Sequence, residues 1–267
     1  MKEIIDEKEL IKSSAEFRDL RQLEKDYLLT LTLYEIYNFF SKNLIFKGGT
    51  SLKYFYNLNR FSEDLDFSFI GENSTEGRRM INKLIQKVLD QLNLQYNVVK
   101  VVQRGKEENG AVVGLNYEIR IEGPLNRRLK HFQNIKIDIS LRDDLLREPQ
   151  VKYFLPKYQD IPSFLVPIMD MYEIGVEKVS SILEKGKMTD IYDLYFLIEV
   201  RKLHIEKNLL MEKMQKRNEK FDVETLLKKL DATTDSIKWK SELAYLVNPL
   251  PDYNEVIKKI KMELSLP

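Results

Sequence analysis

The sequence contains no cysteine and only two histidines, His131 and His204. Disulfide bonds, thiolate metal ligands and thiol nucleophiles are therefore excluded, and a histidine-rich zinc site is not expected. No run of about 18 apolar residues is present, so we expect nothing that spans a membrane. The N-terminal residues are charged from the start and lack the apolar core of a secretory signal. Together these absences predict a soluble cytoplasmic protein.

A strong net charge is also missing, because 43 Lys and Arg residues nearly balance 42 Asp and Glu residues. Contact with nucleic acid would therefore depend on a local basic patch and not on the charge of the whole molecule. The chain has 267 residues, of which 43% are hydrophobic, which is enough for one large domain or two smaller ones with their own cores.

The order of the apolar patterns predicts two parts of different character. Helical spacing dominates residues 1–43, and strand-like runs follow at 64–70, 96–103, 114–122 and 134–141, with a helix after Ser74. A proline-punctuated segment occupies residues 147–169, after which the chain is expected to be helical. We therefore expect an N-terminal α/β domain over residues 1–145 and a helical domain over 146–267.

Two carboxylates stand out in the strand-like run D-L-D-F-S-F. Asp64 and Asp66 are two residues apart, so both side chains point to one face while Leu65 and Phe67 pack on the other. Two neighbouring carboxylates repel each other unless a cation is present, and Mg²⁺ is bound by one or two carboxylates together with phosphate oxygens. Asp138 stands alone in a second apolar strand, and three such residues can hold two metal ions.

A glycine pair lies shortly before the acidic strand. Gly48 and Gly49 follow a short apolar run, and Thr50 or Ser51 is a suitable cap for a helix that runs to about Tyr56. Backbone N–H groups at such a turn can approach a triphosphate closely, and the helix N-terminus favours its negative charge.

Three more residues lie close enough in the sequence to reach the same cavity. Arg60 is expected either to bind a phosphate through two hydrogen bonds or to orient the two acids. Ser62, two residues later, also lies close enough to the acidic strand to reach this cavity. Lys47, directly before the glycines, is the alternative source of that positive charge.

Each signal also has an ordinary structural explanation. A glycine pair before a helix is usually only a turn, D-x-D on a strand can be a solvated sheet edge, and a lone aspartate can lie near a turn. The structural explanation needs these three features to coincide by accident. Their combination favours metal-dependent phosphoryl chemistry.

The segments K-G-G-T-S-L at 47–52 and R-F-S-E-D-L-D at 60–66 resemble the opening signature of the nucleotidyltransferase superfamily. More narrowly, they are similar to the AbiEii/MenT-type nucleotidyltransferase toxins. Residues 177–197 look like that family's helical E-K-x-x-A segment followed by R-D-x-x-D-L. The resemblance covers roughly residues 40–200.

The resemblance implies an α+β fold, with a nucleotidyltransferase-like N-terminal mixed β-sheet flanked by helices and a helical C-terminal lobe. It implies an NTP substrate, Mg²⁺, a tRNA acceptor and a cognate antitoxin. Asp64 and Asp66 would be metal ligands, and residues 48–51 would cradle the triphosphate. Lys178 would contact nucleotide phosphates and Asp190 would complete the site. Thr189 stands where the family usually has arginine, which leaves Lys187 as a possible substitute.

The second block also has a structural interpretation. Lys178 lies in an apolar helical pattern, where a lysine often extends along a packed helix toward solvent. Asp190 and Asp193 are three residues apart, and Asp193 is expected to have a structural role, paired with a Lys or Arg.

We therefore predict a metal-dependent nucleotidyltransferase, with Asp138 as a ligand of a second metal or as the base that activates the acceptor. Candidate RNA contacts are Arg78 and Arg79, residues 126–131, and residues 212–220. Two alternatives remain at this point: transfer to a protein hydroxyl, and a catalytically inactive nucleotide-binding module.

Overall fold

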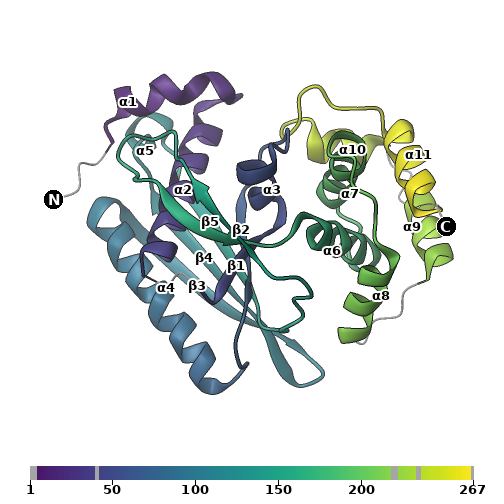
Figure 1. Ribbon diagram of the computed structural model, residues 1–267. Coiled ribbons are helices and arrows are strands. Elements are labelled where there is room, and N and C mark those ends of the chain that lie inside the picture. The colour runs from purple at the N-terminus through teal and green to yellow at the C-terminus, as the bar shows by residue number, and fades with distance from the viewer. Residues whose placement is uncertain (1–4, 40–41, 218–221, 233–235, 266–267) are drawn as a thin grey trace. The chain divides into compact units, whose positions relative to one another are not determined.

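The computed structural model describes residues 5–39, 42–217, 222–232 and 236–265 (Figure 1). It divides into two compact units, each of which is described by itself. The first contains residues 1–55, 62–143 and 149–168, and the second contains residues 56–61, 144–148 and 169–267. The short segments 56–61 and 144–148 thus belong to the second unit although their neighbours on both sides belong to the first.

The first unit is built on a mixed seven-stranded sheet with the order β3-β4-β5-β2-β1-β7-β6. Its strands are β1 (Leu44–Lys47), β2 (Asp64–Phe69), β3 (Asn97–Glu108), β4 (Ala111–Glu122), β5 (Gln133–Ser140), β6 (Gln150–Phe154) and β7 (Phe164–Ile168). The pairs β2–β5 and β1–β7 are parallel, and the remaining neighbours are antiparallel. The four strands predicted between residues 64 and 141 and the expected α+β class are confirmed.

The helices of the first unit are α1 (Glu7–Lys12), the 3₁₀ turn η1 (Ser13–Glu16), α2 (Leu20–Phe39), α3 (Gly48–Tyr56), α4 (Thr75–Gln95) and α5 (Asn126–Leu129). Helices α2 and α4 cover one face of the sheet. The Tyr37 ring of α2 lies 6.3 Å from the Phe67 ring, and the Tyr117 hydroxyl of β4 donates to Asn82 of α4. Ser74 caps α4 as expected, accepting a hydrogen bond of 3.1 Å from the Gly77 N–H.

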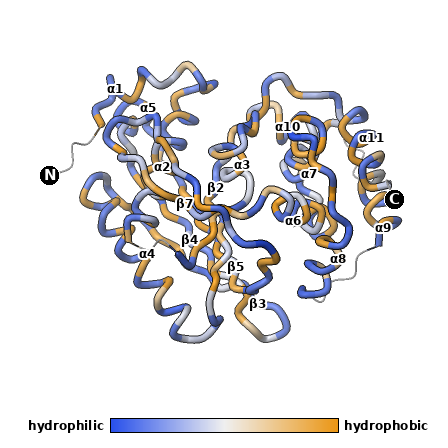
Figure 2. The backbone as a smooth tube through the Cα atoms, in the orientation of Figure 1, coloured by the Kyte–Doolittle hydropathy of each residue, from blue (hydrophilic) through white to orange (hydrophobic). Residues whose placement is uncertain are grey.

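Strand β5 shows how the two faces of the sheet differ. Its residues alternate between buried and more exposed positions, so that Ile135 and Ile137 are fully buried while Lys136 is exposed. This alternation follows from the period of two in a strand, which turns every second side chain toward the helices. Figure 2 shows the apolar stretches that run along the strands.

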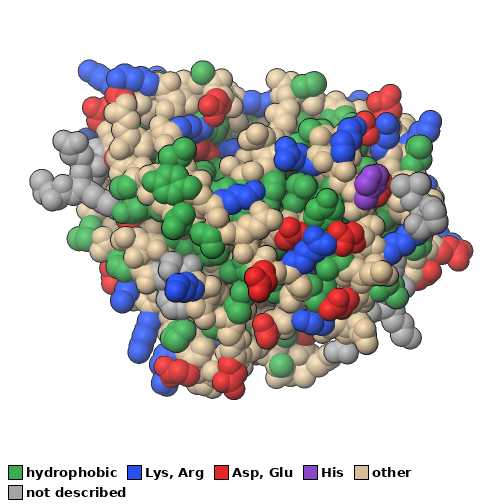
Figure 3. Space-filling model, in the orientation of Figure 1, with side chains coloured by type: hydrophobic (Ala, Val, Ile, Leu, Met, Phe, Trp, Pro, Cys, Tyr) green, Lys and Arg blue, Asp and Glu red, His purple; other side chains and the backbone are tan. Residues whose placement is uncertain are grey.

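Three strands are absent from the sequence prediction: β1, which was expected only as a short apolar run, and the two strands of a hairpin. Residues 150–154 and 164–168 form the β6–β7 hairpin within the first unit, so the predicted domain boundary at residue 145 differs from the structural division. The second strand was not predicted because it contains Pro167, and proline cannot donate a backbone hydrogen bond within a sheet. In the structure the pairing of β7 with β1 is made by the next residue, Ile168. Val151, Tyr153 and Leu165 are more than half exposed, and hydrophobic side chains gather over this hairpin in Figure 3.

The second unit is helical, as predicted. Its helices are α6 (Met171–Glu184), α7 (Met188–Tyr195), the π-helical turn η2 (Phe196–Val200), α8 (Lys207–Lys216), α9 (Val223–Ala232), α10 (Ser236–Leu243) and α11 (Tyr253–Leu264). Trp239 is the largest buried side chain, and its ring contacts Tyr192 of α7 and Tyr253 of α11. Its Nε1–H donates to the Pro251 carbonyl at 3.0 Å, which satisfies the one polar atom of the indole.

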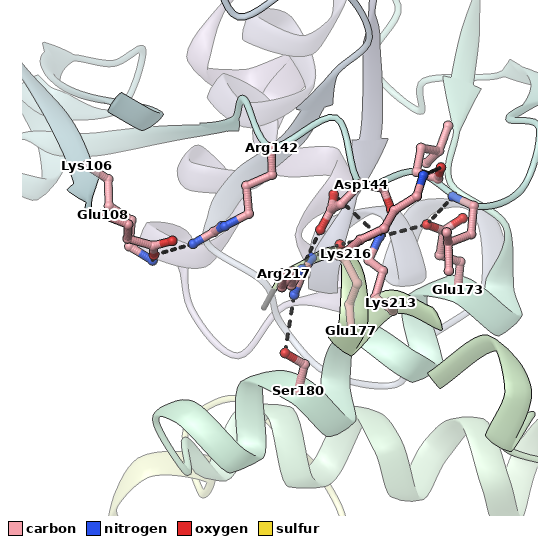
Figure 4. A network of polar contacts seen from close by, with 12 residues as sticks. Lys106, Glu108, Arg142, Asp144, Glu173, Glu177, Ser180, Lys213, Lys216 and Arg217 are labelled. Atoms are coloured by element: carbon pink, nitrogen blue, oxygen red, sulfur yellow. Dashed lines mark hydrogen bonds and ion pairs between the residues drawn. The ribbon is translucent and has the colours of Figure 1, made fainter. Parts of the chain in front are cut away.

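A buried ionic network holds segment 144–148 within the second unit (Figure 4). Lys213 is fully buried, and its Nζ lies 2.7 Å from Glu173 and 3.3 Å from Glu177. It also donates to the Asp144 carbonyl at 2.8 Å, and Arg217 pairs with the Asp144 carboxylate. Since each buried charge has a partner of opposite sign, the network joins α6, α8 and this segment without leaving an uncompensated charge.

None of the helices in the described residues has both the length and the hydrophobicity that crossing a membrane requires.

Candidate active site

Strand β2 presents Asp64 and Asp66 on the face opposite to α2 and α4. Leu65 and Phe67 between and after them are fully buried, whereas both aspartates are partly exposed. The alternation predicted from the sequence is therefore present, and the two carboxylates leave the sheet on the same side.

Cross-strand pairs on this face form one row of polar side chains across five strands. The row consists of Lys47 on β1, Asp66 on β2, Asp138 on β5, Asn116 on β4 and Arg104 on β3. Neighbouring strands lie about 4.8 Å apart, so Asp66 and Asp138 are immediate neighbours. The structure thus places Asp66 directly beside Asp138, with Asp64 two residues before Asp66 on the same face of β2.

The same row contains two residues that sequence reasoning missed. Asn116 and Arg104 are both exposed, and they follow Asp138 outward along the row. A single Asn or Arg within a strand belongs to no motif, and only the register of β3, β4 and β5 shows that they share a face with the acids.

Gly48 fits closely against the acidic strand. Its φ of +74° lies in the left-handed region, and a Cβ atom built there would lie 2.3 Å from Asp66 Oδ2. Only glycine meets both conditions without strain or collision. Helix α3 starts at this residue and continues through nine residues, so its first N–H groups and positive dipole end lie beside the Asp66 carboxylate.

The hydroxyl groups near this helix start are buried, and that of Thr50 forms hydrogen bonds inside the protein. Thr50 and Ser51 are fully buried and Ser62 is nearly so. The Thr50 Oγ1 lies 2.5 Å from the Asp64 carbonyl and 2.8 Å from the Ser62 Oγ. The Thr50 hydroxyl is the donor in both contacts, so its one proton is shared between the Asp64 carbonyl and the Ser62 oxygen. Thr50 and Ser62 therefore tie α3 to the start of β2, whereas the Ser51 Oγ is buried and has no hydrogen-bond partner among the described residues. Contact of residues 48–51 and Ser62 with a nucleotide stays a prediction.

The donor set suits magnesium. Within the described residues no group of three or more His, Cys, Asp or Glu side chains is arranged to hold a metal ion by itself. Mg²⁺ does not require such a group, since it is commonly bound by one or two carboxylates and completes its octahedron with water and substrate phosphates. The adjacent carboxylates of β2, with Asp138 next to them, meet that requirement.

In the second unit, Arg60 forms an ion pair with Asp193. Its Nε and Nη2 donate to the two carboxylate oxygens of Asp193 at 2.6 and 2.8 Å, and its Nη1 donates to the Phe61 carbonyl at 2.8 Å. The side chain is only 6% exposed. The structure thus shows the two-pronged contact of Arg60 with Asp193, whose expected structural pairing is confirmed, and the phosphate contact of Arg60 stays a prediction.

Lys178 completes this cluster. Its Nζ lies 2.7 Å from Asp190 Oδ1 and 2.7 Å from Asp193 Oδ2. Burial alone would lower the pKa of Lys178, but the two carboxylates outweigh it and raise the pKa above its usual value. Burial would likewise raise the pKa of Asp190, yet the Lys178 charge, with a hydrogen bond of 2.7 Å from Ser181, holds that pKa below its usual value.

Ser181 and Lys187, which the comparison with the family pattern singled out, both interact with Asp190. Ser181, which stands where alanine is usual, donates the hydrogen bond to Asp190. Lys187 precedes α7 directly and is among the charges that lower the pKa of Asp190. Whether Lys178 and Asp190 contact a nucleotide stays a prediction.

The three predicted RNA contacts differ in what the structure shows. Arg127 and Arg128 of α5 are exposed, and Arg79 of α4 pairs with Glu76 at 3.0 Å. In the third cluster, Lys213 is buried in the ionic network and residues 218–220 lie outside the described residues.

Comparison with known proteins agrees with this geometry. Residues 32–263 match the model of the family described as nucleotidyl transferase AbiEii toxin, type IV toxin–antitoxin system. The chain belongs to the AbiEii nucleotidyltransferase toxin family. No curated protein matches the sequence.

Two solved structures share the fold of this AbiEii family member. MenT4, a nucleotidyltransferase toxin from Mycobacterium tuberculosis, has a TM-score of 0.61 at 16% identity over 97% of this chain and 86% of its own. JHP933 from Helicobacter pylori has a TM-score of 0.55 at 21% identity over 92% of this chain and 91% of its own. These similarities, both below 25% identity, show that the three chains share a fold.

Proposed function

We propose that this chain is a Mg²⁺-dependent nucleotidyltransferase that moves a nucleotide from an NTP to an RNA acceptor, with tRNA the first candidate. The observation that supports it most is the register that sets Asp66 beside Asp138, with the Asp66 carboxylate against Gly48. Membership of the AbiEii family supports the nucleotidyl transfer and a cognate antitoxin.

Each group on this face has a distinct task in the proposed reaction. Asp64 and Asp66 hold the Mg²⁺ ion, which when bound neutralises the triphosphate charge and stabilises the leaving pyrophosphate. The backbone N–H groups at the start of α3 donate to phosphate oxygens, as helix N-termini commonly do. Lys47, which pairs with Asp66 in the row, adds positive charge beside the phosphates.

Asp138 is positioned to act on the acceptor. As a base it removes the proton from the acceptor hydroxyl, whose oxygen forms a bond to the α-phosphorus. The bond between that phosphorus and its bridging oxygen breaks, and pyrophosphate leaves. A second role, as ligand of a further metal ion, is the alternative for this residue.

For Lys178 and Asp190 the proposal is twofold. Their mutual ion pair fixes α6 against α7, and the family resemblance assigns Lys178 a contact with nucleotide phosphates. Variants of this pair should therefore change both stability and the KM for NTP if the second assignment holds.

The experiment is incubation of the full chain with each of the four α-labelled NTPs, Mg²⁺ and total tRNA. Label should enter the RNA with the native protein and with Glu63→Gln, an exposed neighbour of the strand, but not with Asp66→Asn or after chelation. Label in added protein instead of RNA would favour transfer to a Ser, Thr or Tyr hydroxyl. No transfer with any NTP would contradict the proposal and favour the inactive module.

A further inference from the structure

Four basic side chains lie on the same face of the sheet as the acidic row. Lys100 of β3 pairs with Arg120 of β4, Lys136 of β5 pairs with Asp64, and Arg104 ends the row that contains Asp138. The odd and even positions of each strand face opposite sides, so the register places all four with the carboxylates and away from α2 and α4. We call these four residues the basic track.

The basic track carries an excess of positive charge. Glu118 is the acid in its middle, 3.9 Å from the Arg104 guanidinium, with 68% of the Arg104 side chain still exposed. Lys100, Arg120 and Lys136 are exposed, and none of the three forms an ion pair within the part of the chain that the structure describes. The Arg120 guanidinium lies 4.4 Å from the centre of the Phe132 ring, which holds it over the sheet without neutralising it.

The track is continuous with the acidic site at one end and with a basic turn at the other. Lys136 is two residues before Asp138 on β5, so it lies next to the row on the same face. Beyond Arg120 the chain leaves β4 and enters α5, where Arg127 and Lys130 are also exposed. The positive charge therefore leads away from the carboxylates toward the β4–β5 connection.

We propose that the basic track binds the phosphates of the RNA acceptor and leads its reactive end to Asp138. This inference rests on the proposed function for the identity of the acceptor. On this face the four cations outnumber Glu118 and Glu122, the two acids of β4 beside them, so the track complements a polyanion. Phosphate contacts by Lys and Arg give affinity without selecting a base sequence. An acidic protein is the competing occupant, and the test separates it from RNA.

The test compares two triple variants of the full chain. Lys100→Gln, Arg120→Gln and Lys136→Gln remove three charges from the track. The control removes three other exposed charges, through Lys83→Gln and Lys87→Gln of α4 on the opposite face and Lys258→Gln of α11 in the second unit, so the net charge is the same. Circular dichroism and thermal unfolding establish that both variants fold. Binding of labelled unfractionated tRNA is then measured between 50 and 200 mM salt.

The track variant should bind tRNA about tenfold or more weakly at 100 mM salt, and its slope of log K against log[salt] should be about 2 to 3 units less steep. The control should bind as the native chain does. If the track variant bound tRNA as tightly as the native chain, the proposal would be overturned and an acidic protein would be the favoured partner of this face. If both variants bound tRNA equally weakly, the proposal would also be overturned, because the effect would then come from net charge in general. If the track variant lost tRNA binding but the native chain transferred no nucleotide, the RNA-binding face would be supported and the proposed function would be rejected.

Discussion

Replacing Gly48 by alanine tests how the glycine pair and the acidic strand depend on each other. The new Cβ would lie 2.3 Å from Asp66 Oδ2, whereas ordinary contact begins at 3.4 Å, so the carboxylate must move by about 1 Å. The φ of +74° adds a separate cost of about 1–2 kcal/mol for a residue with a Cβ. A displacement of about 1 Å at a reacting group commonly costs about 100-fold in rate.

Gly110 provides a matched control for this experiment. Its φ of +79° is nearly the same, but a Cβ there meets nothing within 4 Å. Gly110→Ala therefore measures the backbone strain alone, and both variants should lose about 1–2 kcal/mol of unfolding free energy from that strain. Gly48→Ala should lose more than this and should also lower kcat/KM for nucleotide transfer by about 100-fold.

The assay combines chemical denaturation of both variants with the labelled-NTP transfer reaction. Gly110→Ala should retain the activity of the native chain, because the β3–β4 turn lies outside the site. If Gly48→Ala matched Gly110→Ala in both stability and activity, the close contact between Gly48 and Asp66 would have no functional consequence, and the reasoning would be refuted.

Three further predictions follow from the ionic groups. Asp66→Asn should reduce nucleotide transfer by at least about 100-fold. Thermal stability should be kept, since the substitution relieves repulsion between neighbouring carboxylates, and a loss of stability that accounts for the loss of activity would contradict this. Arg60→Gln should lower the unfolding free energy by about 1.5–3 kcal/mol, because the fully buried Asp193 loses its hydrogen bonds from Arg60 but keeps Lys178 as a partner. Denaturant unfolding unchanged from the native chain would contradict it. Because the pKa of Asp190 is lowered in the folded state, Asp190 stabilises the fold above the unfolded-state pKa of about 3.9, and this stability is lost as the pH falls through the folded-state pKa. Because the pKa of Lys178 is raised, Lys178 stabilises the fold below about pH 10.4, and this stability is lost at higher pH. The melting temperatures of the native chain and Asp190→Asn should therefore differ at pH 7 and converge at strongly acidic pH, and a constant difference would count against this ion pair.

The period-two pattern of the sequence was sufficient to predict β2 and the direction of its two aspartates. It was also sufficient for β5, whose alternating isoleucines are typical of a half-buried strand. The pattern does not predict which strands pair or in which register. Asp66 and Asp138 are neighbours only because β2 and β5, about 70 residues apart in the sequence, pair in parallel.

Arg60 shows a different limit of sequence reasoning. Its closeness to Asp64 in the sequence suggested a shared cavity, yet residues 56–61 belong to the second unit, where Asp193 holds the guanidinium. Thr50 and Ser62 show a related limit. Their hydroxyls satisfy one another and a backbone carbonyl inside the protein, which a motif cannot distinguish from a contact with substrate.

The most direct test of the central claim is a crystal structure of the full chain grown with Mg²⁺ and a non-hydrolysable NTP. The account predicts a metal ion about 2.0–2.1 Å from carboxylate oxygens of Asp64 and Asp66, with the triphosphate at the start of α3. A nucleotide bound elsewhere, or a metal ion that neither aspartate touches, would contradict it.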